Sequence, residues 1–217
     1  MDTQQPITQG YPVRLAIEYP DRQLNRVTTF FRLIVAIPIL ITLGSVSGGS
    51  WSTTWETGDE YIRFGGAAGG LLFVAPLLLI LFRQKYPRWW FDWNLNLLRF
   101  QTRVFAYLAL MDDRYPSTDE EQSVRLDIDY PDVRQDLNRW LPLVKWLLVI
   151  PHVFVLAILG IAGLFVVIVA WFAILFTGRY PRGLFDFIEG LFRWGTRAEA
   201  YSLLLVTDRY PPFSLEA

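Results

Sequence analysis

The sequence predicts an α-helical integral membrane protein: four transmembrane helices in two hairpins that form parallel repeats, with cytoplasmic amphipathic helices and a small β-sheet. Two observations lead to this fold class. The chain is 53% hydrophobic, yet its charged residues avoid three stretches, 33–46, 64–82 and 146–176, and long uncharged apolar stretches are typical of transmembrane segments. The chain also repeats its own sequence patterns, and internal repeats constrain architecture strongly.

Three sequence patterns each occur twice along the chain. They are VRLAIEYP at 13–20 and VRLDIDYP at 124–131, FRQKYPR at 82–88 and FTGRYPR at 176–182, and DRYP at 113–116 and 208–211. The patterns predict a first repeat over 13–116 and a second over 124–212. A linker at 117–123 separates them, with tails at 1–12 and 213–217. The chain is therefore expected to be pseudo-dimeric.

The lengths of the apolar stretches set the number of predicted helices. The segments 27–46 and 64–82 are each about as long as one bilayer crossing needs. The third stretch, 146–176, has 31 residues without a formal charge. As one helix it would reach about 46 Å, against a hydrocarbon core of about 30 Å. A start at Leu141 and a break at 160–163 give two arms, which match the two helices of the first half. Hairpins that dip into the bilayer without crossing it are the alternative.

The distribution of Lys and Arg predicts the orientation. The loop at 44–63 holds one basic residue, Arg63, and the turn at 160–163 holds none, so the other 19 lie on the opposite side. By the positive-inside rule, the N-terminus, the segment 83–140 and the C-terminus are cytoplasmic. We therefore expect a multi-pass protein of the bacterial inner (plasma) membrane. Its halves would share one orientation, related by an axis along the membrane normal.

Each repeat begins with a candidate β-strand. In 13–19 and 124–130, large apolar residues alternate with charged or small ones and a proline follows, which is typical of a half-buried strand. Each repeat also ends with a second candidate strand, 106–111 and 200–207. Together these strands would form a small sheet beneath the membrane.

An amphipathic helix is predicted before the last strand of each repeat. Over 89–104, Trp and other apolar residues recur every three or four positions on one face, with Arg99 and Arg103 on another, and 184–198 repeats the arrangement. Such a helix suits the boundary between headgroups and acyl chains. The other interpretation is a core helix whose apolar face packs on the sheet and whose arginines are solvated.

Basic residues at matched positions of the two repeats are the candidate ligands of lipid headgroups. Clusters of Lys and Arg beside a membrane segment often contact anionic phospholipids. Two structural interpretations compete: the Tyr-Pro-Arg segments anchor the helices at the interface, or the arginines pair internally with Asp92 and Asp186. The candidates are Lys85, Arg88, Arg99, Arg103, Arg179, Arg182, Arg193 and Arg197.

Three ionisable residues lie within the apolar segments. Arg32 and Lys145 are near the starts of matched helices, where such side chains usually snorkel to the headgroups. His152 follows Pro151, matched by Pro38, but has no basic counterpart itself, and it is the intramembrane polar candidate. It could relay protons or bind a pigment or a metal. It could also hydrogen-bond the carbonyl that a proline kink releases.

No catalytic set is found in the sequence. It holds no GxSxG, Walker or HExxH motif and no paired acidic cluster within an apolar segment. Without cysteine and with a single histidine, the chain offers no thiolate zinc site, disulfide or cysteine nucleophile. The net charge of −1 argues against nucleic acid as the main partner. We expect no enzyme activity, no metal and no cofactor.

The order of these elements resembles a bacterial membrane family, domain of unknown function 4389. The resemblance rests on Tyr-Pro at 86–87 and 180–181 and on Arg-Tyr-Pro at 114–116 and 209–211, and it covers nearly the whole chain as two tandem copies. Shorter members hold a single copy, which implies that their homodimer resembles this fused pair. The family carries no assigned activity, so the resemblance implies a membrane topology and no function.

The sequence favours a non-enzymatic membrane scaffold or accessory subunit that binds lipid headgroups and a membrane partner, within a larger membrane protein complex. A duplicated basic and aromatic interface without catalytic motifs is the reason. The alternative is a small transporter or channel with a path between the two repeats, motivated by the kinks expected at Pro38 and Pro151. Such a path usually needs intramembrane polar residues, which are scarce here.

Overall fold

The computed structural model describes residues 10–47, 51–57, 60–66, 74–118, 120 and 122–216, with the backbone alone at 47, 51–57 and 60–66. Most of the predicted N-terminal tail and the glycine-rich start of the second apolar segment, at 67–70, lie outside the described residues.

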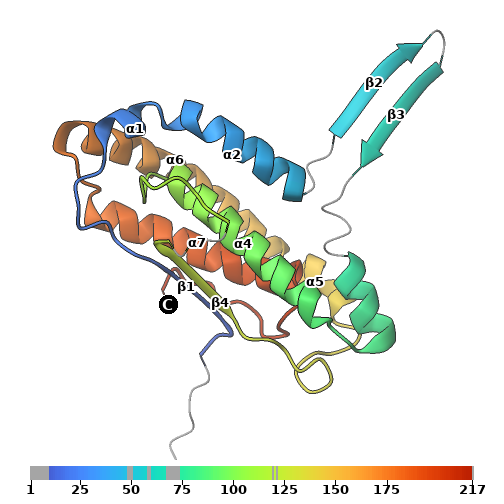
Figure 1. The fold of residues 1–217 in the computed structure, drawn as a ribbon. Helices are drawn as coiled ribbons and strands as arrows, with labels where there is room; N and C mark the ends of the chain where they lie inside the picture. Colours follow the sequence, from blue (N-terminus) through green and yellow to red (C-terminus); the bar gives the residue numbers. More distant parts are fainter. Residues whose placement is uncertain are drawn as a thin grey trace, which may run out of the picture.

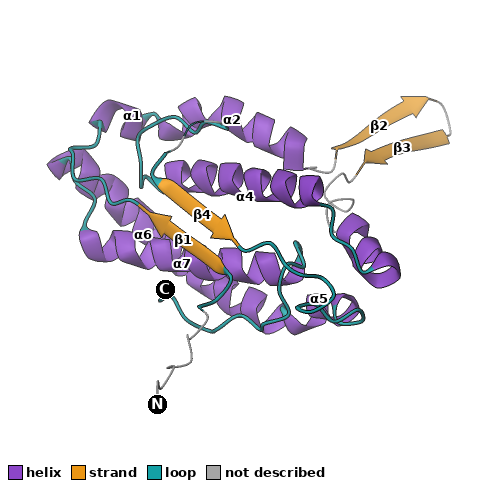
Figure 2. Cartoon of the chain, turned by 60° about the horizontal axis from the view of Figure 1, so that its bottom comes forward, coloured by secondary structure: helices purple, strands orange, loops and turns teal. Residues whose placement is uncertain are grey.

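The described elements form three layers (Figures 1 and 2). Two strands form the outer layer: β1 (Val13–Ile17) packs on one helix of the middle layer and β4 (Val124–Ile128) on the other. The helices of the middle layer are α4 (Arg88–Leu108) and α7 (Arg182–Ser202). The remaining helices lie on the far side from the strands, where α2 packs on α4 and α6 packs on α7. They are α1 (Arg26–Phe30), α2 (Arg32–Ser47), α5 (Pro142–Leu148) and α6 (Ile150–Thr177).

Two further features belong to the first half of the chain. The strands β2 (Trp51–Thr57) and β3 (Glu60–Gly66) pair antiparallel and project away from the layers (Figure 1). They replace most of the predicted loop at 44–63. A short apolar helix over Val74–Arg83 ends as the π-helix η1 (Leu79–Arg83) and leads into α4.

The two alternating patterns form the predicted strands. β1 and β4 pair antiparallel, with Leu15 directly opposite Leu126, and in both strands buried and exposed residues alternate. The buried side chains face α4 and α7, as expected for strands with one face on a core. The sheet therefore joins the first half of the chain to the second.

The predicted strands at 106–111 and 200–207 are wrong. Instead, α4 continues to Leu108 and α7 to Ser202, and each helix is followed by a turn with one residue of positive φ, Leu110 at 65° and Leu205 at 58°. A short apolar run does not distinguish a strand from the end of a buried helix. The amphipathic helices predicted before these segments are confirmed, and they form the packed middle layer.

The prediction of four transmembrane helices in two hairpins is wrong. Among the described residues, one helical stretch, Pro142–Thr177, is long and apolar enough to cross a membrane, while Arg32–Val46 and Val74–Arg83 are shorter. The helix α6 runs without a break through Gly160 and Gly163. Glycine inside a helix costs only about 1 kcal/mol relative to alanine, so a pair of glycines does not by itself make a turn. The helix ends at Thr177, and the following Gly178 has a φ of 73°, which suits a C-terminal cap.

A continuous α6 predicts alanine substitutions of different effect at its two central glycines. A Cβ at residue 160 would meet nothing within 4 Å, whereas one at residue 163 would lie 2.9 Å from Leu191 Cδ1. We expect Gly160→Ala to raise the free energy of unfolding by about 1 kcal/mol through helix propensity, and Gly163→Ala to gain less because Leu191 must shift. Denaturant unfolding of the detergent-solubilised protein, followed by circular dichroism, measures both. Destabilisation by Gly160→Ala would indicate a turn.

Candidate functional site

The layer of α1, α2 and α6 exposes a broad apolar surface. Its large side chains are between 45% and 78% exposed: Val27, Phe30, Leu33, Ile34, Ile37 and Ile41 from α1 and α2, and Val153, Phe154, Ile158, Ile161, Leu164, Phe165, Ile168, Val169, Phe172 and Phe176 from α6. We call this set the apolar face. The two parts meet where Phe30 stacks on Trp171, with ring centroids 6.0 Å apart. Contiguous exposed apolar surface on this scale marks a membrane or protein contact.

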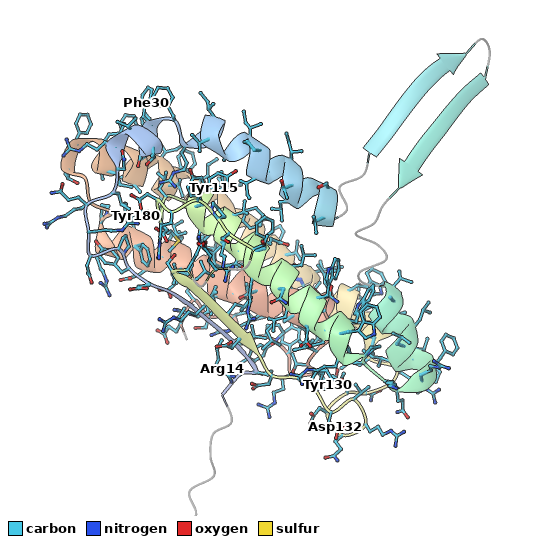
Figure 3. The ribbon with its side chains drawn as sticks, viewed as in Figure 1. Arg14, Phe30, Tyr115, Tyr130, Asp132 and Tyr180 are labelled. Carbon is cyan, nitrogen blue, oxygen red and sulfur yellow. The ribbon has the colours of Figure 1, made fainter. Side chains whose placement is uncertain are left out.

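The opposite side of the molecule is polar. In Figure 3, Phe30 points outward from α1 at one edge, while Arg14 and Tyr130 lie beside the strands at the other. Arg14 pairs with Asp129, with Nη2 2.6 Å from Oδ1, and both side chains are more than half exposed. The molecule is therefore amphipathic as a whole, with charges on the strand side and apolar side chains on the α6 side.

Four of the predicted headgroup ligands are used inside the polar side. Arg99 Nε donates to the carbonyl of Leu126 at 2.8 Å, and Arg193 Nε donates to the carbonyl of Leu15 at 3.2 Å. Each arginine thus ties a middle-layer helix to the strand of the other half. Arg103 donates to the carbonyl of Ser117 and Arg197 to that of Glu216. Arg99 and Arg193 are therefore internal structural groups, but their acidic partners are Asp127 at 3.1 Å and Glu189 at 2.8 Å. The expected pairing with Asp92 and Asp186 is not formed by these two arginines.

The other four candidates lie at the starts of α4 and α7. Arg88 lies 3.3 Å from Asp92, and Arg182 lies 3.7 Å from Asp186, in exposed pairs four residues apart. Each guanidinium also lies over a tyrosine ring, at 4.7 Å and 4.4 Å. Lys85 and Arg179 are exposed in the preceding turns. The two helix starts lie at opposite ends of the molecule (Figure 1), so the eight candidates do not form one site.

Arg32 and Lys145 are buried inside the protein, 2% and 0% exposed, rather than extended to the surface. Lys145 Nζ donates to the carbonyl of Thr207 at 2.7 Å and lies 2.7 Å from Asp208 Oδ1. Arg32 Nη1 donates to the carbonyl of Asp112 at 2.8 Å. The sequence does not reveal these partners, because they follow α4 and α7 and are far from both residues along the chain.

A groove beside Arg32 is a feature that sequence reasoning missed. It has a volume of about 440 Å³ and lies between α1 with the start of α2, the end of α4, and α6. Its lining residues are Thr29, Phe30, Arg32, Leu33, Leu108, Leu110, Leu164, Val167, Ile168 and Trp171. Three buried polar atoms of this lining have no hydrogen-bond partner: Thr29 Oγ1, Arg32 Nε and Arg32 Nη2.

His152 is enclosed by aromatic rings. Its Nδ1 accepts a hydrogen bond from Trp194 Nε1 at 2.9 Å, and its ring stacks on Phe213 with centroids 4.0 Å apart. A neutral imidazole that accepts at Nδ1 carries its hydrogen on Nε2, and that atom is buried without a partner. No group of three His, Cys, Asp or Glu side chains in the described part of the chain could hold a metal ion. The contacts assign His152 to the packing of α6 on α7.

A half-buried carboxyl between the middle-layer helices predicts a dependence of stability on pH. Burial raises the pKa of Glu199 on α7 from 4.5 to about 7, although a hydrogen bond with Gln101 of α4 favours ionisation. The folded state therefore holds this proton more tightly than the unfolded state does. We expect the free energy of unfolding to fall between pH 4.5 and 7, by on the order of 3 kcal/mol.

The variant Glu199→Gln tests whether this carboxyl causes the pH dependence. The variant should lose that part of the pH dependence measured by urea unfolding, because glutamine does not ionise. The matched control is Glu18→Gln, which removes an exposed carboxylate. A wild-type pH profile in the Glu199→Gln variant would exclude Glu199 as the cause.

Comparison with known proteins matches residues 140–214 to a family described as "Domain of unknown function (DUF4389)". The match covers α5, α6, α7 and the segment after α7. The first half of the chain lies outside it, so two tandem copies of the family are not shown. No curated protein and no solved structure matches the chain. The predicted family resemblance is thus supported for the second half of the chain.

Proposed function

We propose that the protein is a non-enzymatic membrane scaffold or accessory subunit that embeds its apolar face in the bacterial inner membrane and binds lipids and a membrane partner. The strand side would face the cytoplasm. The observation that carries the proposal is the apolar face. Removing one such large apolar side chain from water is favourable by about 1.5–3 kcal/mol of free energy. The described part of the protein leaves most of these side chains uncovered.

The packing of α6 favours an orientation along the membrane plane. The two helices α6 and α7 are antiparallel neighbours: His152 meets Trp194 near one end, Gly163 lies against Leu191 further along, and the chain turns at Gly178. A crossing α6 would therefore carry α7 and its charged residues through the hydrocarbon. A charged side chain there costs at least about 2.5–3.5 kcal/mol, which opposes the crossing.

Exposed tryptophans support an embedded layer. Trp89, Trp93, Trp140 and Trp146 are 67%, 41%, 65% and 58% exposed, and they come from the start of α4 and from the region of α5. Tryptophan is enriched where the hydrocarbon meets the headgroups. These side chains would anchor one end of the apolar face at that boundary, and Lys85, Arg88, Arg179 and Arg182 would be the headgroup contacts.

We also propose that the first half is a diverged copy of the matched domain. Contacts recur at matched positions and are exchanged between the halves: Tyr19 donates to the carbonyl of Tyr180, and Tyr130 to that of Tyr86. Leu15 and Leu126, which are also matched, face each other in the sheet. These contacts support a pseudo-dimer whose two-fold axis is normal to the layers, and therefore to the membrane.

The alternative of a transporter or channel between the halves has less support. The described junction contains the paired strands and buried rings of Tyr86 and Tyr180, where a path would need polar lining.

Charged substitutions on the apolar face test the membrane contact. We expect Ile161→Asp combined with Phe165→Asp to reduce recovery with liposomes in a flotation assay by at least about tenfold, because two carboxylates replace exposed apolar side chains. The matched control, Ala16→Asp, introduces a charge on the exposed face of β1 and should float as the wild type does. Equal recovery of all three proteins would contradict the proposal.

The orientation of α6 can be measured with single cysteines, because the chain has none. Trp140→Cys and Arg179→Cys place exposed thiols before α5 and after α6, and Arg125→Cys places one on β4. In sealed vesicles, an impermeant maleimide should label all three to the same extent before detergent is added. If α6 crosses the bilayer, residues 140 and 179 will differ in labelling.

A further inference from the structure

We infer that the groove beside Arg32 binds one anionic membrane lipid, with an acyl chain between α2 and α6 and the charged headgroup at Arg32. The inference deepens the proposed membrane function and rests on it. The groove volume of about 440 Å³ falls within the range of roughly 300–1,000 Å³ that is usual for small-ligand sites.

The charge of Arg32 calls for an anionic ligand. No carboxylate of the described residues forms an ion pair with this guanidinium, which contacts the Asp112 carbonyl and lies 4.0 Å from the centre of the Tyr107 ring. The nearby carboxylates are engaged elsewhere: that of Asp112 binds Arg22, Arg114 and Ser123, and that of Asp113 binds Arg22. Nε and Nη2 of Arg32 are buried and unpartnered. Burying these two donors of a charged group without acceptors is costly.

The matched position in the second half provides an internal comparison. Lys145 has the same kind of burial and the same contact to a backbone carbonyl, but Asp208 neutralises it at 2.7 Å. Asp113, the acidic residue of the first DRYP pattern, is instead bound by Arg22. The first half therefore retains a buried cation with free donors where the second half has a closed ion pair.

The walls of the groove indicate that its ligand comes from the bilayer. Phe30, Leu33, Leu164 and Ile168 line the groove and also belong to the apolar face, exposed by 57%, 75%, 61% and 45%. A chain lying in the groove would thus be continuous with the surrounding lipid. Thr29 Oγ1, also buried and unpartnered, adds a second polar group beside Arg32. An oxyanion held by a guanidinium and a hydroxyl matches a phospholipid phosphate.

The test measures lipid binding to the full chain in nonionic detergent by native mass spectrometry, with phosphatidylglycerol, phosphatidylcholine and chain-free glycerol phosphate as probes. We expect one phosphatidylglycerol per protein, bound at least about tenfold more tightly than phosphatidylcholine. Arg32→Gln should abolish this preference. Val167→Trp, which fills the groove and leaves Arg32 in place, should weaken both lipids. The control Arg125→Gln, on the exposed face of β4, should change neither.

Three results would overturn the inference: equal binding of the two lipids by the wild type, the same loss in Arg125→Gln as in Arg32→Gln, or displacement of the lipid by glycerol phosphate, which would show a site for a soluble anion. If Arg32→Gln does not fold, Val167→Trp still decides whether the groove holds the chain. Flotation of the same preparation separates the two proposals. A wild type that floats without a lipid preference refutes the groove site alone, and one that does not float refutes the membrane function.

Discussion

The pairing of β1 with β4 is the constraint on which the other layers depend. Leu15 opposite Leu126 fixes the register, and the strands then offer carbonyls that Arg99 and Arg193 bind from the two middle-layer helices. Because each arginine bonds the strand of the other half, α4 and α7 are held on one face of the sheet. On the sides of α4 and α7 that face away from the sheet, α2 packs on α4 and α6 packs on α7. No described element covers the outer side of α2 and α6. The position of the apolar face thus follows from a two-stranded contact on the opposite side of the protein.

The sequence predicts the local structure well where a single period governs a segment. The strict alternation at 13–19 and 124–130 identifies both strands, and the three-to-four spacing identifies α4 and α7. It fails where two structures suit the same residues. The apolar stretch 146–176 is compatible with a hairpin or with one long helix, and the choice is made by α7, which provides a packing surface along α6. Gly163 faces this surface, with Leu191 against it, so a glycine that suggested a turn serves close packing.

The candidate site was harder to predict, because its polar groups are paired through tertiary contacts. Arg99 and Arg193 belong to a basic stripe on a helical wheel, but carbonyls more than twenty residues away along the chain accept their hydrogen bonds. The repeated sequence patterns predict that Arg32 and Lys145 are equivalent, yet Asp208 neutralises Lys145 while Arg22 binds Asp113, the acidic residue of the other DRYP pattern. This difference depends on how the segment at 20–25 packs, which no periodic pattern encodes.

The layered arrangement also explains how a long apolar helix and a charged sheet coexist in one small protein. If the halves are copies related by an axis normal to the layers, the same axis is the natural membrane normal, and both halves then present their apolar helices to one leaflet. An in-plane α6 leaves the ion pairs of α7 in water and buries the apolar face. The charged side chains then stay hydrated while the apolar side chains are removed from water. A crossing α6 would satisfy its own hydrophobicity and place Arg182, Asp186 and Arg193 in hydrocarbon. The packing between α6 and α7 therefore links the orientation proposed for the apolar face to the fold, because α6 could cross a bilayer only if it separated from α7.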